Sequence, residues 1–79
     1  MNLKDDAKKY RTILGKEIQL AREAKGFTVE LVAATMGIKP TTVKSIEAGR
    51  FGISIDFLVM FSMILEHEFK VIPQQSYQR

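Results

Sequence analysis

Cysteine and tryptophan are absent from this 79-residue sequence, which also has only one histidine, His67. Without cysteine there is no disulfide, no thiolate metal site and no cysteine nucleophile. No apolar run approaches the roughly 18 residues that a membrane-spanning helix needs, and the first residues lack the apolar stretch of a signal peptide. We therefore expect a cytoplasmic protein with no membrane partner. Packing alone must stabilise so small a domain, which favours a dimer.

Groups that could support catalysis are also scarce. His67 stands between Glu66 and Glu68, and adjacent side chains do not easily converge on one metal ion. The sequence contains no phosphate-binding glycine loop and no recognisable nucleophile with its base. The sequence thus predicts a protein that is not an enzyme and holds no cofactor or metal, with His67 as an exposed or capping residue.

The charge is unevenly distributed along a chain whose length suits a single domain. Residues 1–50 hold ten basic and six acidic residues, whereas residues 51–79 hold two basic and three acidic ones. So small an excess of basic over acidic residues is common on soluble proteins. The first half of the chain is nevertheless the part expected to contact phosphate groups.

Apolar spacing and capping residues predict an all-α fold. Apolar residues recur at steps of three and four along the first helix, and Gly15 within it costs up to about 1 kcal/mol unless close packing requires the missing side chain. Thr28 and Ser54 are N-cap residues, and Pro40 suits the first turn of a helix. The predicted helices cover residues 3–24, 29–36, 40–49 and 55–65.

A short strand is expected at residues 68–72, where polar and mostly apolar residues alternate before Pro73. This chain offers no second strand, so the expected pairing is with the same strand of another copy. The alternative is an irregular tail packed on the helices. Residues 1–72 would form one domain, and residues 73–79 a disordered tail.

Residues 28–49 have the spacing of a helix-turn-helix motif. Ala33 is small where the two helices would cross, and Gly37 suits a turn that requires positive φ. Val43 and Ile46, spaced three residues apart, would face the core together with Ile38.

This sequence resembles the Xre family of helix-turn-helix domains, which includes the phage lambda repressor and Cro proteins. The resemblance implies a lambda repressor-like domain of four to five helices that places its third helix in the DNA major groove and binds a two-fold symmetric operator as a dimer. Val29 and Pro40 depart from the family pattern, at positions where polar DNA-contacting residues are common. The residues that carry the resemblance are Leu14, Gly15, Ile18, Arg22, Lys25, Gly26, Phe27, Thr28, Leu31, Ala33, Met36, Gly37, Ile38, Val43, Ile46, Glu47, Gly49, Arg50, Ser54, Ile55, Asp56, Leu58 and Leu65.

The resemblance also assigns roles to individual residues. On the outer side of the third helix, Thr41, Lys44 and Ser45 are candidates for contact with base edges, although a solvated polar face would have the same composition. Arg22 and Glu47 would form a structural ion pair. The candidates for phosphate contact lie at helix ends or beside the turn, and are Thr28, Lys39, Thr42 and Arg50.

The last helix carries more apolar residues than one side can bury in so small a core, which indicates a subunit interface. The residues predicted to contribute to it are Phe57, Met60, Phe61, Met63, Phe69 and Val71. The alternative is that Leu58, Phe61 and Leu65 are ordinary core residues.

Two functions compete with a homodimeric repressor that binds double-stranded DNA. An antitoxin would regulate its own operator through the same domain and hold a toxin protein on another surface. A helix-turn-helix module used only for protein contact is favoured by Val29 and Pro40 and disfavoured by the basic first half.

Overall fold

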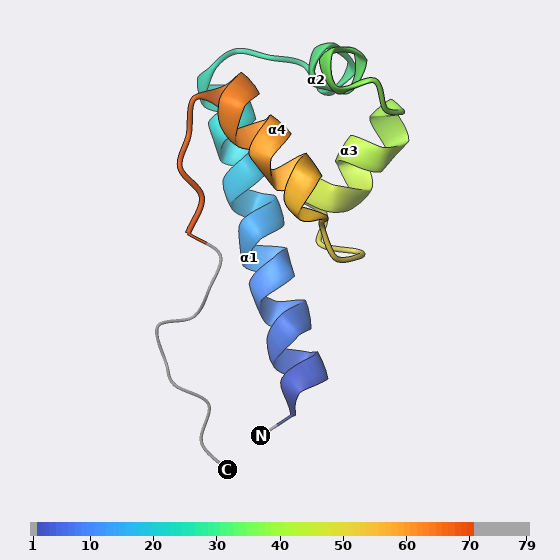
Figure 1. Ribbon diagram of the computed structural model, residues 1–79, viewed down its shortest axis with the longest axis vertical. Helices are drawn as coiled ribbons and strands as arrows, with labels where there is room; N and C mark the ends of the chain where they lie inside the picture. The colour runs from blue at the N-terminus through green and yellow to red at the C-terminus, as the bar shows by residue number, and fades with distance from the viewer. Residues whose placement is uncertain (1, 71–79) are drawn as a thin grey trace.

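The computed structural model describes residues 2–70, and in this part of the chain every regular element is an α-helix. Helix α1 spans Leu3–Ala24, α2 Val29–Met36, α3 Pro40–Glu47 and α4 Ile55–Leu65. Helix α1 packs against both α3 and α4, and α2 packs against α3. The N-terminal half of α1 extends beyond the other helices (Figure 1). The all-α prediction is confirmed.

Local side-chain contacts explain where the helices begin. The Asn2 side chain accepts hydrogen bonds from the backbone N–H groups of Lys4 (3.0 Å) and Asp5 (3.2 Å). The hydroxyl oxygens of Thr28 and Ser54 accept from the N–H groups three residues further on, at 3.0 and 3.1 Å. Each contact satisfies a donor that has no partner inside the helix, so these starts follow from the local sequence.

Two helix ends reverse the chain in the same way, through a residue in the left-handed conformation. Gly37 ends α2 with φ of 74°, and the Ile38 N–H donates to the Ala33 carbonyl at 3.0 Å. At the end of α4, Glu66 adopts the left-handed conformation with φ of 48°, although it is not glycine. The bond from the His67 N–H to the Ser62 carbonyl (3.1 Å) has the same spacing as that at Gly37. Both ends thus satisfy carbonyl groups in the last turn of the helix.

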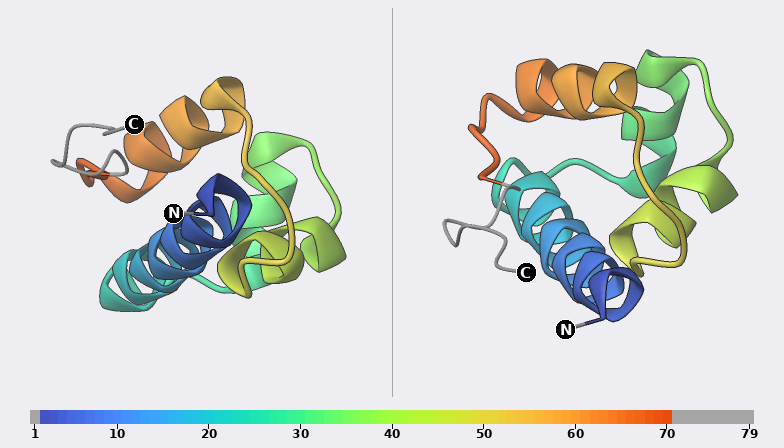
Figure 2. Two further views of the ribbon diagram at one scale, coloured as in Figure 1. Left: turned by 90° about the horizontal axis from the view of Figure 1, so that it is seen from below. Right: turned by 60° about the horizontal axis from the view of Figure 1, so that its bottom comes forward.

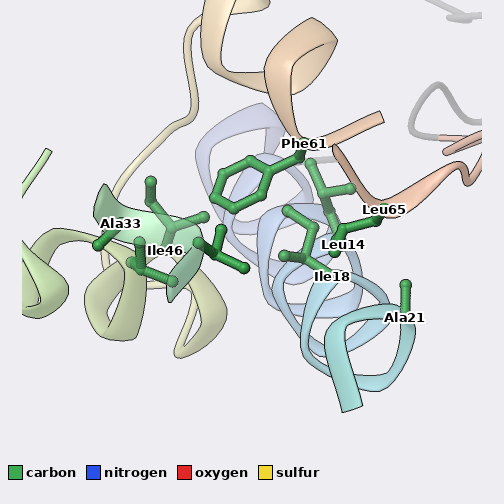
Figure 3. Packing of buried hydrophobic residues seen from close by; sticks show 9 residues of the cluster. Leu14, Ile18, Ala21, Ala33, Ile46, Phe61 and Leu65 are labelled. Carbon is green, nitrogen blue, oxygen red and sulfur yellow. The ribbon is translucent and has the colours of Figure 1, made fainter. Parts of the chain in front are cut away.

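The hydrophobic core joins all four helices. Phe61 and Leu65 of α4 face Leu14 and Ile18 of α1, while Ala33 and Ile46 lie at the other end of the cluster (Figure 3). The buried hydrophobic residues are Leu14, Ile18, Ala21, Val32, Ala33, Val43, Ile46, Phe61 and Leu65. Burial of Val43 and Ile46 confirms the predicted inner side of α3, which fixes α3 against α1 and α2.

Phe61 is a predicted interface residue that the structure places elsewhere. Its side chain is 0% exposed and lies in the core of the single chain, so no surface remains for a subunit partner. Helix α4 is apolar on two sides, and Phe61 belongs to the side that packs on α1. The sequence left both an interface role and a core role open for Phe61, because spacing alone does not identify which apolar side of a helix is covered. Its burial in the single chain favours the core role.

The chain after α4 turns back along α1 (Figure 2). His67 Nε2 lies 2.8 Å from Glu17 Oε2, and the Ser62 hydroxyl donates to the His67 carbonyl at 2.8 Å. Phe69 is partly buried against the core, and its ring centroid lies 4.6 Å from that of His67. These contacts hold the segment on the helices as far as Phe69.

The predicted strand at residues 68–72 is not formed over residues 68–70 of the single chain, where no second strand is available to pair with it. The rest of that strand, including Val71, and the predicted tail at residues 73–79 lie outside the described residues. Strand pairing across a dimer therefore stays a prediction. Within residues 2–70, no helix is both long and apolar enough to cross a membrane.

Candidate nucleic-acid interface

The outer side of α3 presents polar side chains to solvent. Thr41 and Lys44 are exposed and Ser45 is partly exposed, on the side of the helix opposite Val43 and Ile46. Since the inner side of α3 is fixed in the core, these three side chains project from a rigid support. A hydroxyl can donate or accept a hydrogen bond, and a lysine can donate to guanine, so this side has groups suited to base edges.

The candidates for phosphate contact surround this side of α3. Lys39 precedes α3 and Arg50 follows it, both exposed, and Thr42 is partly exposed in the first turn. The oxygen of Thr28 is used as the cap of α2, but its hydroxyl hydrogen remains able to donate to a phosphate oxygen. The structure thus places one cation at each end of α3.

Arg22 and Glu47 connect α1 to the end of α3. Arg22 Nε lies 2.7 Å from Glu47 Oε2, and Nη2 lies 3.1 Å from Oε1, so the contact is bidentate. Nη1 also donates to the Phe27 carbonyl at 2.8 Å. The two side chains are only 12% and 8% exposed. The hydrogen bond to Glu47 raises the pKa of Arg22 above its ordinary value, against the opposing effect of burial.

Glycine allows α1 and α3 to approach closely at the same end of α3. A Cβ on Gly15 would lie 2.5 Å from the Ile46 carbonyl oxygen and 2.6 Å from that of Glu47. Beyond α3, Arg11 Nε donates to the Gly49 carbonyl at 2.9 Å. The close packing that would justify a glycine at position 15 is therefore present, and α1 sets the position of the C-terminal end of α3.

A shallow hollow on this surface includes a residue that the sequence prediction missed. Gln19 of α1 lines it beside Val29 of α2 and Lys44 and Ala48 of α3. Gln19 thus brings a carboxamide next to Val29, the position where the family pattern often has a glutamine. The sequence did offer a sign of this placement, because Gln19 is one helical turn from both Gly15 and Arg22 and so shares a side of α1 with them.

Carboxylate and imidazole groups do not gather into a metal site in the described part of the chain. No group of three or more such side chains is placed to hold an ion between residues 2 and 70. His67 is instead engaged with Glu17, and Glu66 lies 2.7 Å from Lys25, which lowers the pKa of Glu66 below its usual range.

The family described as helix-turn-helix matches residues 18–66, more than half of the chain. No curated protein and no solved structure matched the sequence. The matched residues run from the middle of α1 through α4, and include the ion pair, the turn and the exposed side of α3. The match supports a DNA-binding regulator. This chain belongs to the helix-turn-helix family, in the group typified by the Xre and lambda repressor proteins.

Proposed function

We propose that this protein is a sequence-specific repressor of transcription that binds an inverted-repeat operator in the cytoplasm as a homodimer. The observation that carries the proposal is the outer side of α3, where Thr41, Lys44 and Ser45 project from a helix held rigidly in the core. An α-helix fits the major groove, where each base pair presents a distinct pattern of donors and acceptors. Lys44, an exposed lysine on this side of α3, would select guanine.

Phosphate contacts would position α3 without selecting sequence. Lys39 and Arg50 flank the helix, and Thr28 and Thr42 offer hydroxyl groups at the starts of α2 and α3. The N–H groups in the first turn of each helix add the partial positive charge of a helix N-terminus. Together these groups supply affinity that depends on salt concentration.

Dimerisation would use the second apolar side of α4. Ile55, Val59 and Met63 follow one another at steps of four and are 71%, 49% and 74% exposed. Met60 adjoins them, and Phe57 is partly buried between this side and the core. A row of exposed apolar residues along one helix is typical of an interaction surface. A two-fold dimer would place the two α3 helices about 34–36 Å apart, one turn of DNA.

The test is selection of bound duplexes from a random DNA pool, followed by titration of the best sequence and a scrambled one at two salt concentrations. We expect an inverted repeat that binds far above the scrambled duplex. Salt-sensitive binding without any sequence preference would contradict the proposal, as would the absence of binding.

Two matched substitutions then separate base reading from phosphate contact. Lys44→Ala should lower the preference for the selected sequence by about 1–3 kcal/mol, because it removes a contact with a base edge. Arg50→Ala should weaken binding to both duplexes equally and reduce the salt slope by about one unit. If Lys44→Ala weakens both duplexes equally, Lys44 does not read sequence.

A further inference from the structure

We infer that α1 carries a second phosphate-binding surface, outside the helix-turn-helix motif, that contacts the DNA backbone beside the region read by α3. The surface is a row of four residues on α1, Lys8, Thr12, Lys16 and Gln19, here called the lysine row. This inference rests on the proposed function, since it needs DNA to be bound at α3.

The spacing of the lysine row places its members on one side of α1. They follow one another at steps of four, four and three residues, which stack over successive turns of an α-helix. The eleven residue steps from Lys8 to Gln19 correspond to about 16 Å of helix, at about 1.5 Å per step. The row is thus long enough to contact more than one phosphate.

Contacts with α3 show that this side of α1 continues the candidate DNA-binding surface. At one end of the row, Gln19 shares a hollow with Lys44 and Ala48 of α3. In the middle, Thr12 lies against Gly49, whose added Cβ would come within 2.7 Å of the Thr12 Cα atom. Lys8 lies one turn before Thr12, in the N-terminal half of α1.

The charge of the row is available to an anion. Lys8 and Lys16 are exposed, and neither is in an ion pair within residues 2–70. The only side-chain hydrogen bond of Lys16 there is a long one, 3.4 Å, to the Gln19 carboxamide. The acidic residues nearest the start of α1, Asp5 and Asp6, occupy its first turn, where they complement the helix dipole. The row itself contains no acid, and acidic residues lie at its two ends: Asp5 shares a hollow with Lys8 and Thr12, and the Gln19 carboxamide lies 3.5 Å from the Glu23 carboxylate.

Its position favours the DNA backbone as the anion. A duplex bound at α3 brings a dense line of negative charge next to Gln19 and Thr12, and unpaired lysines beside it would release counterions from the phosphates. These contacts would add affinity without adding sequence preference, because phosphates are the same at every base pair.

The test compares two double variants that lose the same charge, one within the lysine row and one outside it. Lys8→Gln with Lys16→Gln removes the charge of the row. Lys25→Gln with Lys70→Gln removes two charges beside and after α4, where Lys25 pairs with Glu66. All four lysines are exposed, so we expect both variants to fold. Each is titrated with the selected and the scrambled duplex over a range of salt concentrations.

We expect the row variant to lose about two units of salt slope, with the preference between the two duplexes unchanged, because each lysine accounts for about one phosphate. The control variant should keep the slope of the original protein. An equal salt slope in the row variant and the original protein would overturn the inference. The lysine row would then face solvent or bind an acidic protein surface. Equal losses in both variants would also overturn the inference, since net charge alone would then act. If the original protein binds no DNA, the proposed function itself fails.

Discussion

Arg22 is the residue at which three separate parts of the chain meet. Its guanidinium group binds Glu47 at the end of α3 and the Phe27 carbonyl between α1 and α2, from a position in the last turns of α1. A planar guanidinium group with five donors suits this arrangement, whereas a lysine ammonium group does not reproduce the bidentate contact. The pair therefore orients α3 and the start of the helix-turn-helix motif together.

We expect Glu47→Ala to lower the free energy of unfolding by about 3 kcal/mol, because it leaves the largely buried charge of Arg22 without its partner. Urea titration of the original protein and the variant measures the difference. Glu23→Ala, on the exposed side of α1, is the matched control and should change stability by less than about 0.5 kcal/mol. Similar small losses in both variants would show that the pair is screened by solvent.

At the scale of elements, the crossing of α1 over the end of α3 depends on a residue without a side chain. Gly15 is buried, and the atoms that a Cβ would meet are backbone carbonyls of α3, which cannot move away as a flexible side chain could. Thr12 and Gly49 approach closely one turn earlier along α1, where a Cβ on Gly49 would again meet backbone. The two contacts together define where α3 sits on α1.

Gly15→Ala should therefore destabilise the fold by about 1–3 kcal/mol through overpacking, although alanine favours a helix over glycine by about 1 kcal/mol. Gly52→Ala is the control, since no atom lies within 4 Å of its added Cβ and its φ is not positive. Thermal and urea unfolding of the two variants give the comparison. A Gly15→Ala protein as stable as the Gly52→Ala protein would mean that α1 and α3 separate at little cost.

At the scale of the whole molecule, α4 divides its apolar residues between two surfaces. Phe61 and Leu65 complete the core, while Val59 and Met63 remain in solvent on the other side of the helix. The exposed apolar residues Val59 and Met63 do not belong to the hydrophobic core of the described residues. A second copy of the chain, proposed above, would remove these two residues from water.

Val59→Glu combined with Met63→Glu should convert a dimer into a monomer, because the interface would have to bury two charges without partners. Sedimentation equilibrium measures the mass, and binding to the inverted repeat should weaken while binding to a half-site persists. Leu20→Glu, which places a charge on an exposed apolar position of α1, is the control and should leave the mass unchanged. A dimer that survives the double substitution would locate the interface elsewhere, for example at the predicted strand.

Local chemistry explains how much of this fold could be predicted from sequence. The starts of α2 and α4 depend on Thr28 and Ser54, which cap the N–H groups three residues away, and the turn after α2 depends on Gly37. Each of these signals acts within a few residues, so it is visible in the chain itself. The same applies to the inner side of α3, because Val43 and Ile46 are the only residues of that helix with branched aliphatic side chains.

The four helices, the turn between α2 and α3, and membership of the helix-turn-helix family can therefore be inferred from local sequence patterns. Which apolar side of α4 is covered depends instead on how the helices pack, with Phe61 in the core and Met63 in solvent. The packing of the helices also brings Gln19 next to Lys44, two residues far apart in the chain. Capping and periodicity are local properties, whereas burial and adjacency depend on which other element packs against a given side.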